Sequence, residues 1–198
     1  MPIHQHNISA VILAGGQGSR LGGLDKGLLK LKKIALVQHL INRLQPQVAE
    51  IIISANRNIE SYSKLGFPVY RDDIADFAGP LAGILKAMQE CKNEWLLIAP
   101  ADSPFVPDDL AARLAGNIQN NKIAIAHDGK NLQPTFALLH KSLAASLEQF
   151  LKQGERKTRV WMQQQEHAIV DFSDKAKAFV NINTAIELEK AEQYFKEL

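Results

Sequence analysis

Two segments of this chain have the residue types and spacing for chemistry on phosphates. The first is ILAGGQGSRLGGLDKG, residues 12–27, in which closely spaced glycines follow an apolar run and Arg20 and Lys26 come next. Glycines let backbone N–H groups approach an anion closely, and the two side chains add donors and positive charge. The segment predicts a cradle for a triphosphate. The alternative is a surface loop with two solvated cations.

The second segment is APADSPF, residues 99–105, which follows another apolar run. Pro100 and Pro104 stiffen a turn around Asp102. A carboxylate at the end of a strand is well placed to bind Mg²⁺, which takes one or two protein carboxylates together with phosphate oxygens. A turn or helix-capping role is the alternative for Asp102. Opposite a cationic glycine loop, we favour the metal site.

The glycine segment does not fit the two common nucleotide-binding templates. A P-loop requires Gly-Lys followed by Ser or Thr, whereas this chain has Asp25, Lys26 and Gly27. A dinucleotide-binding fingerprint that starts at Gly16 requires glycine where this chain has Leu21. The sequence therefore argues against a P-loop nucleotidase and against a Rossmann dehydrogenase.

Strands and helices that would position these segments alternate through the first two thirds of the chain. We expect strands at 8–13, 50–54, 68–70, 95–99, 122–126, 135–139, 168–172 and 178–180, and helices at 35–44, 59–65, 79–91, 107–114, 142–151, 155–165 and 184–198. This alternation is typical of a mostly parallel sheet with helices on both faces, so we predict a three-layer, Rossmann-like α/β domain. Ligands bind beyond the carboxyl ends of such strands.

Other polar residues also follow predicted strands. Asp72 comes after the third strand and is our choice for a nucleoside contact, and Gly79 and Gly83 allow the start of a helix to approach a ligand. Asn181 and Asn183 alternate, so on a strand they point the same way. They either complete a polar site or, for Asn183, cap the last helix.

Composition bounds the classes of function. The 198 residues are 46% apolar, enough for a full core without a disulfide or metal staple. A net charge of +2, from 23 basic and 21 acidic residues, argues against binding nucleic acid through bulk charge. Cys91 is the single cysteine, which excludes an internal disulfide and a cysteine-based zinc site. We expect a cytoplasmic protein without a membrane partner, because there is no signal-peptide pattern and no run near the ~20 apolar residues of a membrane span.

Four segments, in order along almost the whole chain, carry a resemblance to a known family. They are LAGGQGSRLGGLDKGLL (13–29), DFAGPLAGI (76–84), PADSPFVP (100–107) and FVNINTAIEL (179–188), with a softer match at HDGKNLQPTFAL (127–138). This pattern resembles the molybdenum cofactor guanylyltransferase family. The resemblance implies a single nucleotidyltransferase domain that transfers GMP from GTP to molybdenum–molybdopterin, releases pyrophosphate and uses Mg²⁺. It also implies cofactor-delivery proteins and molybdoenzyme chaperones as partners.

The resemblance implies roles for individual residues, with residues about 1–110 on the nucleotide side and about 111–198 on the acceptor side. The implied nucleotide-binding residues are Leu13, Ala14, Gly15, Gly16, Lys26, Ser54, Asp72 and Asp102. Arg20, Lys26 and Asp102 would be catalytic, with Asp102 as the metal ligand. Gly23, Asn181 and Asn183 would serve the acceptor side. Because the acceptor is a large anion, we add Arg156 from the basic cluster at 156–159, for which a solvated helix start is the alternative.

Some positions depart from the family pattern, and three alternative functions stay open. The family usually has Ser or Ala at Gly18, Met at Leu21 and Asn at Ser54, although a serine hydroxyl can still bind a ribose or base. A cytidylyltransferase for the same cofactor typically reads Ala-Ala-Gly where this chain reads Ala-Gly-Gly at 14–16. A sugar-phosphate nucleotidyltransferase lacks the spacing of Asp25 and Lys26 and the NINT segment. A non-enzymatic nucleotide-binding module would not need Arg20, Lys26 and Asp102 together.

Overall fold

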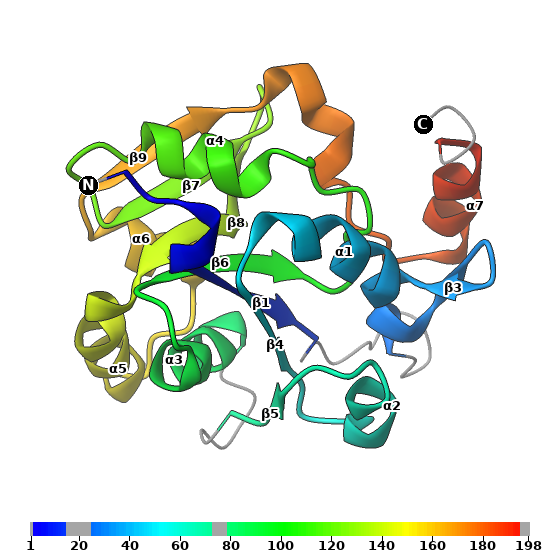
Figure 1. Ribbon diagram of the computed structural model, residues 1–198, viewed down its shortest axis with the longest axis horizontal. Helices are drawn as coiled ribbons and strands as arrows, with labels where there is room; N and C mark the ends of the chain where they lie inside the picture. Colours follow the sequence, from blue (N-terminus) through cyan, green and yellow to red (C-terminus); the bar gives the residue numbers. More distant parts are fainter. Residues whose placement is uncertain (1, 15–24, 73–78, 195–198) are drawn as a thin grey trace.

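The computed structural model describes residues 2–14, 25–72 and 79–194 (Figure 1). Its strands are β1 (Ile8–Leu13), β2 (Lys30–Leu31), β3 (Ile34–Ala35), β4 (Glu50–Ser54), β5 (Val69–Tyr70), β6 (Trp95–Pro100), β7 (Ile123–His127), β8 (Leu132–His140) and β9 (His167–Asp171). Its α-helices are α1 (Leu36–Leu44), α2 (Ile59–Ser63), α3 (Pro80–Glu90), α4 (Leu110–Asn117), α5 (Ala144–Lys152), α6 (Thr158–Gln163) and α7 (Ala185–Tyr194). Short 3-10 helices are η1 (Gln5–Asn7), η3 (Lys26–Leu28), η4 (Gln45–Gln47), η5 (Lys141–Leu143) and η6 (Ser173–Phe179).

The central sheet has seven strands in the order β5-β4-β1-β6-β8-β7-β9. Strand β1 lies in the middle of the parallel half and pairs in parallel with both β4 and β6. Strand β8 runs antiparallel to β6 and to β7, and β9 returns parallel to β7. The carboxyl ends of β1, β4, β5 and β6 therefore meet at one edge, which is where ligands bind in open α/β sheets.

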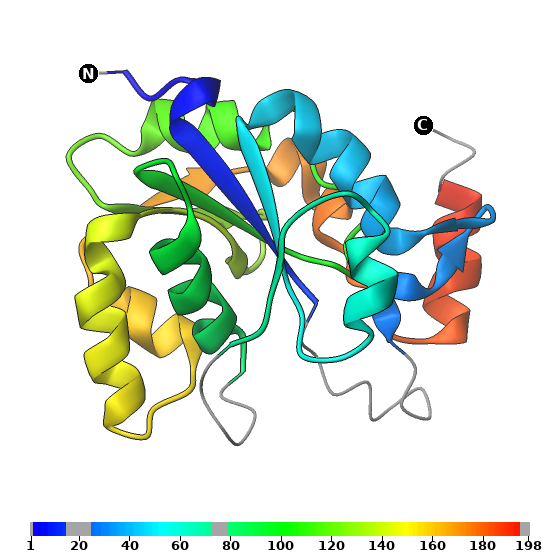
Figure 2. The ribbon, with the colours of Figure 1, turned by 60° about the horizontal axis from the view of Figure 1, so that its bottom comes forward.

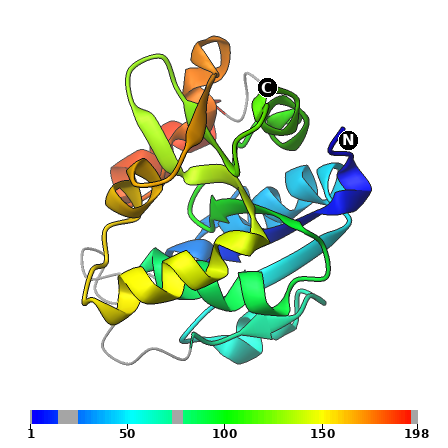
Figure 3. The same ribbon diagram turned by 90° about the vertical axis from the view of Figure 1, so that its left-hand side faces the viewer.

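Helices cover both faces of the sheet, so the fold has three layers (Figure 1). Alternate residues of β1 supply the two cores, because successive side chains of a strand point to opposite faces. Ala10 and Ile12 pack in the core beneath α1 and α4, whereas Val11 packs in the core beneath α3, α5 and α6. Helices α3 and α5 lie side by side on that second face (Figure 3). The predicted three-layer α/β fold with a mostly parallel sheet is confirmed.

The last helix of the described chain packs against an early hairpin. Helix α7 packs beside the β2–β3 hairpin, although the two are separated by about three quarters of the sequence (Figures 1 and 2). A small apolar cluster joins them, in which Ile182 and Ala191 contact Leu31, Leu36 and Phe105. This cluster fixes the segment just before α7 next to the site described below.

Several predicted elements differ from the structure. The strand expected at 178–180 is wrong: residues up to Phe179 form η6, and the Phe179 ring packs edge-on against Phe136 and Phe172. The β2–β3 hairpin was not predicted. The helix expected from 107 begins only at Leu110, where the Gln47 side chain accepts a hydrogen bond from the Ala111 N–H. The helix expected at 155–165 is the shorter α6.

A membrane-spanning helix is not found among the described helices, since each is too short or too polar to cross a bilayer.

Candidate active site

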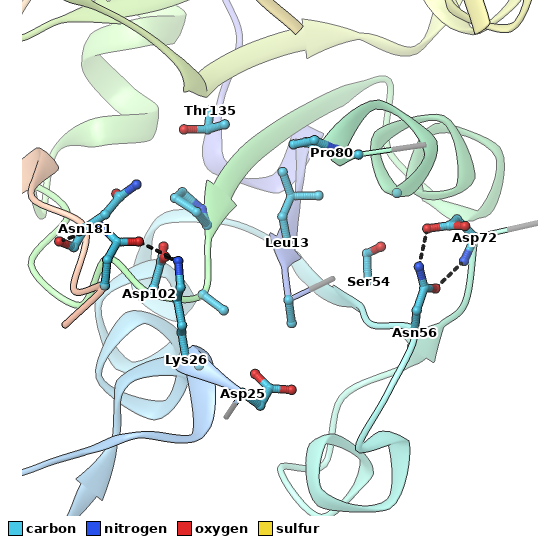
Figure 4. Close-up of a pocket in the computed structure, with 17 residues that line it drawn as sticks. Leu13, Asp25, Lys26, Ser54, Asn56, Asp72, Pro80, Asp102, Thr135 and Asn181 are labelled. Carbon is cyan, nitrogen blue, oxygen red and sulfur yellow. Dashed lines mark hydrogen bonds and ion pairs between the residues drawn. The ribbon is translucent and has the colours of Figure 1, made fainter. Parts of the chain in front are cut away.

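A cavity of about 570 Å³ opens at the carboxyl edge of the parallel strands (Figure 4). Loops after β1, β4, β5 and β6 meet there, together with the start of α3, strand β8 and the segment before α7. Its described lining residues are Leu13, Ala14, Asp25, Lys26, Gly27, Ser54, Asn56, Asp72, Gly79, Pro80, Gly83, Pro100, Ala101, Asp102, Thr135, Asn181 and Asn183.

The charged end of the cavity is built by Lys26 and Asp102. The Lys26 Nζ atom lies 3.7 Å from Asp102 Oδ2 and donates a hydrogen bond of 2.5 Å to Asn183 Oδ1. Asp102 follows β6 and its side chain is only 15% exposed. Burial raises the pKa of Asp102 above its ordinary value, and the positive charge of Lys26 opposes that rise. The carboxylate is thus a desolvated anion that a cation stabilises.

The segment before α7 is fastened to the loop that carries Asp102. The Ile182 N–H donates to the Asp102 carbonyl at 2.9 Å, and the buried Ser103 hydroxyl donates to Asn181 Oδ1 at 2.6 Å. Asn181 and Asn183 both line the cavity, yet they do not lie on a strand. The capping role considered for Asn183 is wrong, because the hydroxyl of Thr184 accepts the bond from the first turn of α7.

The opposite end of the cavity is polar and lies near the start of α3. Figure 4 shows Asp72 and Asn56 together there, with Leu13 and Ser54 between them and the Lys26–Asp102 pair. Asn56 Nδ2 donates to Asp72 Oδ2 at 2.6 Å, and the Asp72 N–H donates to Asn56 Oδ1 at 3.2 Å. The first bond holds one oxygen of the Asp72 carboxylate, and the second holds the Asp72 backbone.

Two glycines allow α3 to begin close to this end. Gly79 precedes the helix with a φ of +70°, a conformation that favours glycine, and Pro80 occupies the first helical position. A Cβ atom at Gly83 would overlap Ser54 Oγ, so the Ser54 side chain at the end of β4 packs directly against the α3 backbone.

The structure brings together eight of the residues predicted from the sequence. They are Leu13, Ala14, Lys26, Ser54, Asp72, Asp102, Asn181 and Asn183. Gly15, Gly16, Arg20 and Gly23 lie outside the described residues. Arg156 does not line the cavity: its guanidinium donates at 2.8 Å to the carbonyl of Leu151, near the end of α5, and at 2.8 Å to that of Glu155. Its backbone does lie next to Gly79, at the rim.

The sequence reasoning missed several lining residues. Asn56 follows β4 as Asp72 follows β5, so its position after a strand was an available signal. Asp25 had such a signal too, since it directly precedes Lys26. Thr135 lies within the softer match at 127–138, but its place in the site depends on β8, whose position beside β6 depends on the order of the whole sheet.

The residues of the charged end fit a divalent cation that is shared with a phosphate ligand. No group of three or more His, Cys, Asp or Glu side chains lies close enough to hold a metal in the part of the chain that the structure describes. A cation here would therefore bind Asp102 and take its other ligands from phosphate oxygens and water, the arrangement that Mg²⁺ prefers. The Asp102 carboxylate, whose side chain is only 15% exposed, would be the protein ligand of such a site.

Comparisons with known proteins find relatives along almost the whole chain. A family model described as a MobA-like NTP transferase domain matches residues 10–169. The molybdenum cofactor guanylyltransferase of Pasteurella multocida is 48% identical over 183 residues, which cover 91% of this chain and 97% of that protein. The molybdenum cofactor guanylyltransferase of Shewanella putrefaciens is 44% identical over 196 residues, 98% and 97% of the two chains. The crystal structure of molybdopterin-guanine dinucleotide biosynthesis protein A from Archaeoglobus fulgidus has the same fold, with a TM-score of 0.78 at 23% identity over 96% of this chain and 100% of that one.

Proposed function

Because this chain belongs to the molybdenum cofactor guanylyltransferase family, we propose that it transfers GMP from GTP to the phosphate of molybdenum–molybdopterin and releases pyrophosphate. The observation that carries the proposal is the cavity with Lys26 and Asp102 at one end and a fixed carboxylate, Asp72, at the other. A nucleoside triphosphate has the matching polarity, with a base at one end and a polyanion that binds metal at the other.

The polar end suits guanine. A guanine base presents two adjacent N–H donors on its Watson–Crick edge, and a carboxylate accepts both. Asp72 is held for this role by its two hydrogen bonds with Asn56. Cytosine presents an acceptor where guanine presents one of these donors, so a negative carboxylate disfavours it. The Asp72 carboxylate is the feature of this site that favours a guanylyl over a cytidylyl donor.

The charged end suits the triphosphate, and catalysis there consists of positioning and charge neutralisation. The acceptor phosphate is the nucleophile, so the protein needs no covalent nucleophile. In the proposal, Lys26 stabilises the departing pyrophosphate and Asp102 holds Mg²⁺. The metal, if bound there, would supply positive charge that offsets the negative charge developing at the α-phosphate. Backbone groups at 13–16 and the Arg20 side chain complete the cradle in this proposal.

The acceptor side is proposed for the second half of the chain. Within one domain, residues about 1–110 bind the nucleotide, and residues about 111–198 supply Asn181 and Asn183, with Gly23 from the glycine segment. Arg156 is the weakest member of this set, because its guanidinium binds carbonyl groups near the end of α5. GTP is a cytoplasmic metabolite, so we place the reaction in the cytoplasm. The product would pass to cofactor-delivery proteins and molybdoenzyme chaperones.

The test is release of pyrophosphate from GTP or CTP in the presence of molybdenum–molybdopterin. We expect turnover with GTP, little with CTP, and a loss of about 10²- to 10³-fold in Lys26→Met and Asp102→Asn, the usual effect of losing one charged transition-state contact. Asp108→Asn is the matched control, because that carboxylate is 76% exposed and pairs with Arg43 away from the cavity. Turnover with CTP and none with GTP would contradict the proposal and indicate a cytidylyltransferase.

A further inference from the structure

The hydroxyl of Tyr62 lies beneath both neighbours of Lys26 in the sequence. On one side it donates a hydrogen bond of 2.6 Å to Asp25 Oδ1. On the other side a Cβ atom at Gly27 would lie only 2.6 Å from Tyr62 Oη and 2.9 Å from Ala101 Cβ. The backbone that carries Lys26 is therefore seated directly on this tyrosine, which comes from α2 and is fully buried.

Asp25 is itself held by more than one donor. Its side chain is only 4% exposed, and besides Tyr62 it accepts a 3.0 Å bond from Asn58 Nδ2 and lies 3.9 Å from Arg57 Nε. Asn58 has a φ of +52°, which asparagine adopts more readily than most residues, and directly precedes α2. Burial, and then the bond to Asp25, raise the pKa of Tyr62, so its hydroxyl stays protonated and keeps donating.

Burying the Asp25 carboxylate is unfavourable in free energy. Desolvation of a charged group is unfavourable unless hydrogen bonds compensate for it, and an apolar pair would pack at this position more cheaply. The hydrogen bond between Asp25 and Tyr62 has a preferred geometry, which an apolar contact lacks. It therefore fixes the positions of both residues. Residue 25 is followed at once by η3, whose first residue is Lys26.

We propose that Tyr62 and Asp25 are positioning residues that hold Lys26, so that its ammonium group meets the triphosphate between Asp102 and Asn183. Tyr62 donates a hydrogen bond to Asp25, just before Lys26, and packs closely against Gly27, just after it. Helix α2 thereby serves the phosphate site without touching it. This inference rests on the proposed function, since the triphosphate is the ligand that Lys26 is positioned for.

The experiment is a double-mutant cycle read out as the Kd for GTP with Mg²⁺ by calorimetry. Tyr62→Phe keeps the buried ring and removes only the hydroxyl, and we expect it to weaken GTP binding about tenfold. Lys26→Met should weaken binding about a hundredfold. If Tyr62 acts through Lys26, the double variant binds GTP within about twofold of Lys26→Met alone. Tyr70→Phe is the matched control, because Tyr70 does not line the cavity, and it leaves Kd unchanged.

The outcomes separate this inference from the function it rests on. Two results would overturn the positioning role while GTP binding stands. In the first, Tyr62→Phe weakens GTP binding equally in the wild type and in Lys26→Met. In the second, Tyr62→Phe weakens GTP binding in neither protein. Asn58→Gly, which removes the second side-chain donor to Asp25 and tolerates the positive φ, gives an independent variant with the same expected pattern. A wild-type protein that binds no GTP overturns the proposed function and this inference with it.

Discussion

The contact between α3 and the end of β4 makes Gly83→Ala an informative substitution. In an ordinary helix interior, alanine is more stable than glycine by about 1 kcal/mol. At Gly83 the new Cβ atom would overlap Ser54 Oγ and lie 3.2 Å from Ser54 Cβ and 3.4 Å from Leu13 Cδ2. Overpacking of this kind costs about 1–3 kcal/mol. The overlap offsets the helix preference of alanine, so we expect a net loss of up to about 2 kcal/mol in the free energy of unfolding.

The second half of this prediction is a rescue. Ser54→Ala removes the overlapping oxygen but keeps the Cβ atom at 3.2 Å, so Gly83→Ala in that background should cost less stability than it does in the wild type. For a chain of this size, we expect Gly83→Ala alone to lower the melting temperature by up to about 8 °C. Urea unfolding and thermal melts of the four proteins measure both effects. A higher melting temperature for Gly83→Ala in the wild-type background would refute the close approach of α3 and β4.

Two further predictions concern the loop after β6 and the helix that follows it. Ser103→Ala removes the 2.6 Å bond to Asn181, so urea unfolding should show a loss of about 1–2 kcal/mol and turnover should fall as the segment at 181–183 loosens. At Asp109, burial raises the pKa, but the hydrogen bond and charge of Lys175 and the charge of Arg113 lower it more, to below its ordinary value. Its stabilising contribution is complete above about pH 4 and is lost as the pH falls through its folded-state pKa. Unfolding measured from pH 6 to pH 2 should therefore show a shallower acid loss in Asp109→Asn; an unchanged slope contradicts the pairing.

The parts of the site that the sequence predicts are those that follow a buried strand. The apolar runs at 8–13 and 95–99 are unmistakable, and the carboxyl ends of parallel strands share an edge, so Lys26, Asp72 and Asp102 are brought together by rules that act locally. The family motifs then indicate nucleotidyl transfer as the chemistry. Alternating strands and helices likewise predict the layers of the fold.

The remaining parts depend on contacts between distant segments, which no local pattern reports. Asn181 and Asn183 reach the cavity because Ser103 and the Asp102 backbone hold their segment, and not because they alternate along a strand. The start of α4 is set by Gln47, a side chain from another helix. Tyr62 looks like an ordinary core residue until its hydroxyl is seen next to Asp25.

Arg156 shows the converse case. Its charge and its place in a basic run favoured a contact with the anionic acceptor. The carbonyl of Leu151 near the end of α5, and that of Glu155, accept its guanidinium instead, at 2.8 Å each. A helix C-terminus attracts cations by its dipole, so a basic cluster just beyond a helix has a structural use that composition alone does not reveal.

The most direct test of the central claim is calorimetric binding of GTP and CTP, with and without Mg²⁺, to the wild type and to Asp102→Ala. The account predicts that GTP binds more tightly than CTP, that Mg²⁺ strengthens GTP binding to the wild type, and that this strengthening disappears in Asp102→Ala. Preference for CTP, or a Mg²⁺ effect that survives the loss of Asp102, would contradict the assignment of guanine to the Asp72 end and of the metal to Asp102.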